Sequence, residues 1–201
     1  MNMKTLLIFL LAVATNVTYA ASTPDFINTC LDCHGPKGVS GHSEVPIIAG
    51  ASAYFIEASL FAYKDDIRPG VKSKFYYGDL KRQKTDMKAI VEKLSDQQIT
   101  EAANYFAKQT FISAKQPFDN KLVKLGKKVH SIRCEKCHGD GGTSVDDDSG
   151  ILAGQWTPYL KLSMKHFKEG TREMDKKMKK KVDKLKDSQW QALLAYYASQ
   201  Q

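Results

Sequence analysis

All four cysteines of this 201-residue chain lie in two copies of one short pattern, which restricts the possible folds more than any other feature. Each copy has two cysteines three positions apart and a histidine directly after the second, as CLDCH at residues 30–34 and CEKCH at residues 134–138. Structural disulfides seldom join cysteines at this spacing, and the two pairs are alike down to the following His-Gly. The fold must therefore present the same five-residue arrangement twice.

This spacing is the pattern of c-type haem attachment. The two thiols bond the vinyl groups of one haem, and the adjacent histidine binds the iron beneath the porphyrin plane. The sequence therefore predicts two covalently bound haem c groups. The predicted residues are Cys30, Cys33 and His34 in the first motif and Cys134, Cys137 and His138 in the second.

Two other kinds of site use paired cysteines. A zinc site built from both pairs would require them to converge, and it would leave both histidines and the repeat unexplained. A thioredoxin-like redox motif belongs in a βαβ setting, and the sequence shows none. Both alternatives are therefore weaker than haem.

The motifs belong to an internal repeat of most of the chain. A shift of 104 residues aligns the two motifs, IIAG at 47–50 with ILAG at 151–154, and Arg68 with Arg172. Further along, a shift of 91 aligns Met87 with Met178. The first copy therefore has 13 extra residues between Arg68 and Met87. We predict one domain at residues 21–108, a linker at 109–120 and a second domain at 121–201.

The periodicity of both copies is helical, so the predicted fold class is all-α. A helix leads into each motif, and a second helix is expected near 53–64 and again near 158–168. A loop or short helix then carries the methionine. The last helix of each copy is expected at about 96–108 and 187–199, with Asp96 and Asp187 as N-caps.

The first 20 residues have the features of a cleaved secretory signal. A basic start at Lys4 precedes an apolar run too short for a permanent anchor, and small residues end the segment at Ala20. No later stretch is long and apolar enough to span a membrane. The sequence thus predicts export to the periplasm.

An electron-carrying haem needs a sixth iron ligand. Met87 and Met178 occupy matched positions in the repeat, and a thioether opposite histidine raises the reduction potential. Met174, one helical turn before Met178, is the alternative for the second haem. A methionine on both haems argues against an enzyme, because catalysis needs an open iron position.

The remaining histidines and aromatic residues are expected to have structural roles. The histidines are His42, His130 and His166, of which His130 is expected on a helix surface. The Pro46 carbonyl is expected to accept a hydrogen bond from His34 Nδ1, and Gly150 stands at the matching position in the second copy. Three aromatic residues are expected either to line the haem crevices or to pack in the core: Tyr54, Trp156 and Tyr159.

With these residues in place, the chain resembles the two-haem class I cytochromes c. It is similar to the c-four type carriers and closer to the cytochrome subunit of flavocytochrome c sulfide dehydrogenase. The quoted stretches ILAGQWTPYL (151–160) and AKQPFD (114–119) carry the closer resemblance. The family implies two tandem class I cytochrome c domains, packed about a pseudo-twofold axis with the haems near the interface.

The resemblance also implies a partner and a function. The partner would be an FAD-containing flavoprotein that oxidises sulfide and forms a heterodimer with this chain, which passes the electrons to a soluble acceptor. The alternative is a free two-haem shuttle to a terminal oxidase. Residues 121–201 carry 17 basic and ten acidic side chains, whereas residues 21–108 carry eleven of each. A basic surface can steer an acidic redox partner, or it can simply be a solvated face that aids solubility. Nucleic acid is a poor partner for an exported haem protein.

Overall fold

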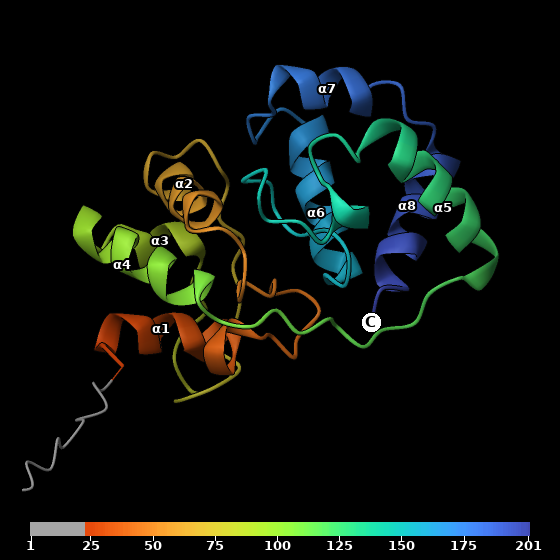
Figure 1. Ribbon diagram of the computed structural model, residues 1–201. Helices are drawn as coiled ribbons and strands as arrows, with labels where there is room; N and C mark the ends of the chain where they lie inside the picture. The colour runs from red at the N-terminus through yellow and green to blue at the C-terminus, as the bar shows by residue number, and fades with distance from the viewer. Residues whose placement is uncertain (1–22) are drawn as a thin grey trace, which may run out of the picture.

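The computed structural model describes residues 23–201 (Figure 1). The predicted signal peptide, residues 1–20, lies outside the described residues. Within residues 23–201 the regular structure is helical, and the only backbone pairing of strand type is an isolated bridge between Ser73 and Thr85. The helices are α1 (Asp25–His34), η1 (Pro36–Gly38), α2 (Ala53–Lys64), α3 (Met87–Val91), α4 (Asp96–Ala107), α5 (Asn120–Arg133), η2 (Asp140–Gly142), α6 (Thr157–Lys168), α7 (Lys176–Val182) and α8 (Asp187–Ala198). The all-α prediction is confirmed.

Figure 1 shows two groups of helices, α1 to α4 and α5 to α8, joined by a segment without regular structure at 110–119. We call residues 23–108 the first half and residues 121–201 the second half. None of the described helices is long and apolar enough to cross a membrane.

The caps of the last helices differ from the prediction. The N-cap of α4 is Ser95, whose hydroxyl accepts a hydrogen bond from the Gln98 N–H at 3.2 Å. Gln98 completes the capping box, because its side chain accepts from the Ser95 N–H at 2.9 Å. Asp96 and Asp187 are the first residues inside their helices, where the positive end of the helix dipole still stabilises a carboxylate. The aspartates were therefore placed one residue too far out.

The apolar interior has two main clusters. One lies around Phe106, where buried residues of α1, α2 and α4 meet Ile151 of the second half, and the other lies around Leu193, where α5, α6 and α8 meet. Helices α5 and α8 touch at Gly126, where a β-carbon would overlap the backbone carbonyl of Ala192. This crossing therefore requires glycine.

The two halves are held together through the backbone of Ile47. The buried side chain of Gln155 accepts a hydrogen bond from the Ile47 N–H at 3.0 Å and donates one to the Ile47 carbonyl at 2.8 Å. Beside it, the indole of Trp156 donates to the Ser40 carbonyl at 2.9 Å. Gln155 thus satisfies two main-chain groups of the other half that would otherwise be buried without partners.

Replacing Gln155 with glutamate is expected to destabilise this contact by on the order of 3 kcal/mol. A carboxylate cannot donate to the Ile47 carbonyl, and its charge would be buried. Urea denaturation should show a lower midpoint, with the two halves no longer unfolding together. Gln191→Glu, an exposed position on α8, is the matched control and should change the midpoint little. Equal effects of the two substitutions would contradict this role of Gln155.

Candidate functional site

The first cysteine motif forms the last turns of α1. The helix ends at His34, and Gly35 follows with a φ of 77°, a conformation that favours glycine. His34 Nδ1 lies 2.9 Å from the Pro46 carbonyl oxygen. A carbonyl can only accept, so Nδ1 carries the proton and Nε2 keeps a free lone pair. The predicted Pro46 contact is confirmed, and it fixes the ring in the tautomer that an iron ligand needs.

Burial also keeps this imidazole uncharged. His34 is buried, and desolvation lowers its pKa despite the opposing hydrogen bond to Pro46. No disulfide joins the two cysteines beside it, and burial raises the pKa of the Cys30 thiol to about 12. The motif is therefore preorganised as two thiols and a neutral imidazole.

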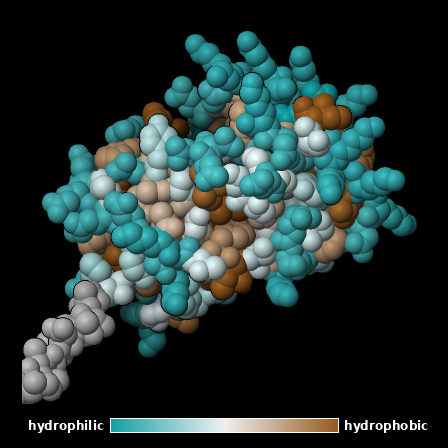
Figure 2. Space-filling view, in the orientation of Figure 1, coloured by the Kyte–Doolittle hydropathy of each residue, from teal (hydrophilic) through white to brown (hydrophobic). Residues whose placement is uncertain are grey.

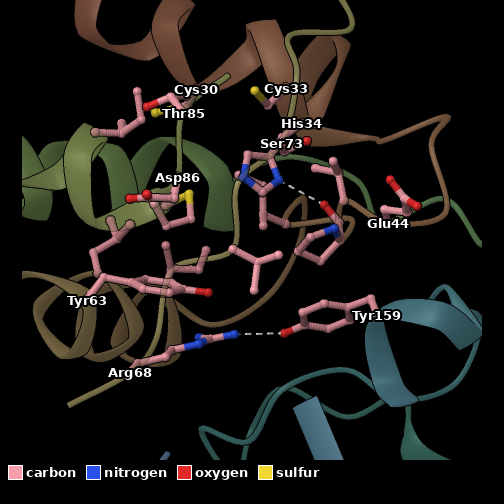
Figure 3. Close-up of a pocket in the computed structure, with 18 of the residues that line it drawn as sticks. Cys30, Cys33, His34, Glu44, Tyr63, Arg68, Ser73, Thr85, Asp86 and Tyr159 are labelled. Atoms are coloured by element: carbon pink, nitrogen blue, oxygen red, sulfur yellow. Dashed lines mark hydrogen bonds between the residues drawn. The ribbon is translucent and has the colours of Figure 1, made fainter. Parts of the chain in front are cut away.

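One cavity brings together the four residues predicted for the first haem. Cys30, Cys33, His34 and Met87 all line it. Figure 3 shows the cysteines and His34 along one side of this cavity, with Tyr63 and Arg68 across from them. The further apolar lining comes from residues that include Ile48, Ile56, Leu60 and Phe106. A cavity with an apolar wall and this donor set fits a covalently held haem.

The second half completes the wall of the first-half cavity. Tyr159, Leu162 and Ser163 of α6 line it, together with His166. Tyr159 was expected at a haem crevice, and the structure places it at the crevice of the other half. Trp156 packs instead against the small interface core around Ile47. The prediction for Tyr54 is wrong, because its side chain is 65% exposed.

A buried cationic cluster lies where the halves meet at this cavity. The buried Arg68 donates a hydrogen bond from Nη2 to the Tyr159 hydroxyl at 3.2 Å, and its guanidinium lies 4.5 Å from the centre of the Tyr63 ring (Figure 3). Arg172, its counterpart in the repeat, lies 4.3 Å from the centre of the Phe167 ring. Within residues 23–201, neither arginine makes an ion pair with a carboxylate.

The charges of this cluster perturb one another. Burial acts to raise the pKa of Tyr159, but the guanidinium groups of Arg68 and Arg172 outweigh it and lower that pKa to about 8. Burial and the charge of Arg68 lower the pKa of Arg172 to about 10. The two guanidinium groups thus share a site with little water, without an acidic side chain from residues 23–201 to pair with. Binding an anion there would be favourable.

The second motif has a different backbone. Helix α5 ends at Arg133, and residues 134–138 form turns in place of helix. His138 Nδ1 is buried and makes no hydrogen bond among the described residues. Burial lowers the pKa of His138, and the nearby Gly150 backbone acts in the opposite direction. The Gly150 contact expected from the repeat is thus weaker than that of Pro46.

Met178 lies in the first turn of helix α7. Asp175 caps the helix, and its carboxylate accepts hydrogen bonds from the Lys177 N–H at 2.8 Å and the Met178 N–H at 3.2 Å. The charge of Lys181, on the next turn, opposes the rise that burial causes in the pKa of Cys134. Met174 precedes the helix, and like Met178 it is half-buried.

The surface position expected for His130 is wrong. Its side chain is 1% exposed, because α5 turns the face of Gly126 and His130 toward α8. His130 Nδ1 lies 2.9 Å from the Tyr197 hydroxyl, and Nε2 lies 2.7 Å from a carboxylate oxygen of Glu135. Glu135 is one of the two residues between the cysteines of the second motif, so the buried His130 helps to hold that motif in place. The repeat gave no signal for it, since no histidine occupies the matching position.

Replacing Tyr197 with phenylalanine is expected to cost about 1–3 kcal/mol of stability, because a buried imidazole nitrogen loses its partner. Guanidinium denaturation followed by circular dichroism would measure the change. Tyr105→Phe is the control, because the half-buried Tyr105 hydroxyl makes no hydrogen bond within residues 23–201. A Tyr197→Phe protein as stable as this control would show that the hydroxyl contributes nothing.

The arrangement of donors counts against zinc. Among residues 23–201, no three or more His, Cys, Asp or Glu side chains gather as a metal-binding group. The four cysteines therefore do not converge, as a shared zinc site would require. Each pair stands with its own histidine.

Comparison with known proteins supports haem in both halves. Residues 121–196 match the family described as cytochrome c oxidase, cbb3-type, subunit III. The chain is 32% identical over 90 residues to cytochrome c-554(548) of Halomonas halodenitrificans, covering 45% of this chain and 95% of that protein. It is 25% identical over 199 residues to the thiosulfate dehydrogenase electron acceptor of Thiomonas intermedia, covering 93% of this chain and 85% of the relative.

A solved structure shows the same two-part architecture. The reduced recombinant cytochrome c4 from Pseudomonas stutzeri superposes with a TM-score of 0.70 at 25% identity, covering 87% of this chain and 95% of that one. The tandem class I cytochrome c fold implied by the resemblance is thereby confirmed. With its two attachment motifs, the chain belongs to the c4-like dihaem class I cytochromes c, electron-transfer proteins that carry two covalently bound c-type haems.

Proposed function

We propose that this dihaem cytochrome accepts electrons from a dehydrogenase that oxidises a reduced sulfur compound. The match to a thiosulfate dehydrogenase electron acceptor along nearly the whole of both chains carries the proposal. Within this class we favour a sulfide-oxidising FAD flavoprotein as the donor and bound partner. That choice rests on the resemblance of residues 114–119 and 151–160 to the flavocytochrome c subunit. A free shuttle to a terminal oxidase is the alternative.

The proposed haem residues follow the repeat. In each half, two cysteines hold the haem, and a histidine and a methionine bind its iron, which supplies a centre that cycles between the ferrous and ferric states. The residues are Cys30, Cys33, His34 and Met87 for the first haem and Cys134, Cys137, His138 and Met178 for the second. Because a histidine and a methionine would fill both axial positions of each iron, no position is left for a substrate, and the chain would transfer electrons without catalysing a reaction of its own.

The chain's own residues prepare the first site for this task. Pro46 holds the His34 ring, and residues of α6 line part of the cavity wall. The carboxylate groups that every haem carries would supply the anions that Arg68 and Arg172 lack among the described residues. These arginines would then help to hold the group and would favour its reduced state only to the extent that the carboxylates leave their charge unbalanced.

The proposed location and boundaries come from the sequence. Cleavage of residues 1–20 would release the chain into the periplasm, with domains at 21–108 and 121–201 and a linker at 109–120. The structure is compatible with this division, since the segment joining the helix groups falls within the linker.

The first test uses the haem-loaded protein and two donors. The oxidised cytochrome would be mixed with a sulfide dehydrogenase flavoprotein subunit plus sulfide, and separately with thiosulfate dehydrogenase plus thiosulfate, and haem reduction followed by absorbance. Rapid reduction by the first pair, and co-purification of a flavin-bearing chain from native cells, are expected. Reduction by thiosulfate dehydrogenase alone would replace the flavoprotein as donor. Reduction by neither would overturn the sulfur-oxidation proposal.

A second test counts the haems. Cys30→Ser with Cys33→Ser, and separately Cys134→Ser with Cys137→Ser, should each reduce the haem content per chain by half. Absorbance of the pyridine adduct gives this number. A variant that keeps its full haem content would contradict the assignment of that motif.

A further inference from the structure

The 13 residues present only in the first copy belong to a loop at residues 69–86, which separates Arg68 from Met87. Its two arms pair through the backbone of Ser73 and Thr85, with N–H to carbonyl distances of 2.7 and 2.9 Å. Within it, Phe75 is buried and the Arg82 guanidinium lies 3.6 Å from the centre of its ring. The extra residues therefore form a packed structure with its own small core.

This loop 69–86 is fastened to the first cysteine motif at Asp32. The backbone N–H groups of Tyr76 and Tyr77 donate to the Asp32 carbonyl at 3.0 and 2.9 Å. The Asp32 carboxylate forms an ion pair with Arg82 at 2.6 Å. Asp32 lies between the two cysteines, so the loop grips the motif at the residue next to Cys33.

The loop also covers the approach to Cys33. Cys33 Sγ lies 3.9 Å from the Lys74 carbonyl oxygen, and its side chain is half-buried. On the neighbouring segment, the His42 ring stacks on Tyr76 with 3.8 Å between ring centres. The second cysteine of the first motif, and the haem edge it would hold, are thus shielded by protein.

The second motif is open at the same place. Only five residues separate Arg172 from Met178, so no comparable loop exists there, and Cys137 is exposed. The repeat places Lys136 where Asp32 stands in the first copy, and a lysine cannot anchor an arginine. Ile132, close before the motif, is 64% exposed.

Basic residues accompany the open motif. Arg133 directly precedes Cys134 in the sequence. The charges of Arg133 and of Lys181 on α7 oppose the rise that burial causes in the pKa of Cys134. Lys136 is exposed between the two cysteines. The lysines of α7 are exposed as well, and Figure 2 shows hydrophilic side chains projecting from the end of the molecule where Figure 1 places that helix. An exposed apolar residue with cationic residues next to it in the sequence fits an acidic protein surface.

We propose that an acidic redox protein exchanges electrons at this open face of the second domain, formed by Ile132, Arg133, Lys136, Cys137 and Lys181, and that loop 69–86 closes the equivalent face of the first. The inference rests on the dihaem assignment and adds the docking surface and the partner's charge. Electrons on the first haem would then reach such a partner through the second.

Charge reversal on each face tests this with the haem-loaded, reduced protein. In stopped-flow oxidation by ferricyanide, a trianion, one electron passes from the protein to give ferrocyanide. Lys136→Glu with Lys181→Glu should slow the reaction about tenfold at low ionic strength. Lys81→Glu with Lys84→Glu, the same charge change on loop 69–86, should slow it less than about twofold, and high salt should remove the difference. Equal slowing by both pairs would overturn the inference.

A binding measurement checks the surface without electron transfer. Poly-glutamate serves as the acidic probe, and hydrogen exchange read by mass spectrometry reports where it binds. Protection is expected at 132–138 and 176–186, and it should be lost in the Lys136→Glu, Lys181→Glu protein. Protection centred on 72–84 would contradict the proposal. Haem content is measured beforehand, so a missing haem counts against the dihaem assignment and a misplaced footprint counts against the docking surface alone.

Discussion

Leucine in place of Gly126 is expected to destabilise the second half by at least about 3 kcal/mol, and the second haem should be poorly incorporated. The carbonyl of Ala192 occupies the space that a side chain would need, and backbone cannot turn aside as a flexible side chain does. Helix α5 would have to move away from α8, which carries Tyr197, the partner of the buried His130. Thermal unfolding by circular dichroism, together with haem content, would measure both effects.

Lys127→Leu is the matched control, because it adds the same side chain at the next position of α5, where the residue is exposed. Its stability should stay within about 0.5 kcal/mol of the parent. If both leucine variants unfold at the temperature of the parent protein, close contact at Gly126 does not limit stability.

Replacing Met178 with alanine is expected to open one of the two haems. The ferrous protein should then bind carbon monoxide at one haem per chain, and the potential of that haem should fall by on the order of 0.1 V. Loss of the thioether removes the ligand that favours ferrous iron, and axial ligands shift haem potentials over a range of about 0.8 V. A redox titration and the carbon monoxide difference spectrum measure the two changes.

Met174→Ala is the direct comparison. Because the repeat aligns Met178, and not Met174, with Met87, we expect Met174→Ala to leave both potentials and the carbon monoxide response unchanged. The opposite pattern would assign Met174 as the ligand. Met87→Ala, made in parallel, should open the first haem in the same way.

The sequence predicted well those features that depend on the spacing of residues close together in the chain. The helices near 53–64 and 158–168 follow from apolar periodicity, and the structure has them at Ala53–Lys64 and Thr157–Lys168. The contact of His34 with Pro46 was also predictable, since a turn after the motif brings a carbonyl back to the imidazole. The predicted N-cap of α4 failed by one residue because serine and aspartate both make good caps, whereas α8 has Lys186 at its N-cap, a residue type that is not favoured there.

Features that depend on packing between distant segments were not predictable. His130 looks like a surface residue when only its own helix is considered, and its burial depends on the approach of α8 at Gly126. The repeat aligned Arg68 with Arg172, but a sequence alignment cannot show that both converge on Tyr159. Likewise, the 13 extra residues were visible as an insertion, whereas their attachment to Asp32 is a matter of tertiary structure.

The hydrogen bonds of Gln155 have a consequence for how separable the two repeats are. Gln155 grips the backbone of Ile47, and the preceding residue, Pro46, is the one that orients His34. The histidine of the first repeat is therefore steadied, through two adjacent residues, by a side chain of the second. In this chain the two repeats are coupled, and a first repeat expressed by itself would lose the side chain that holds the backbone next to Pro46.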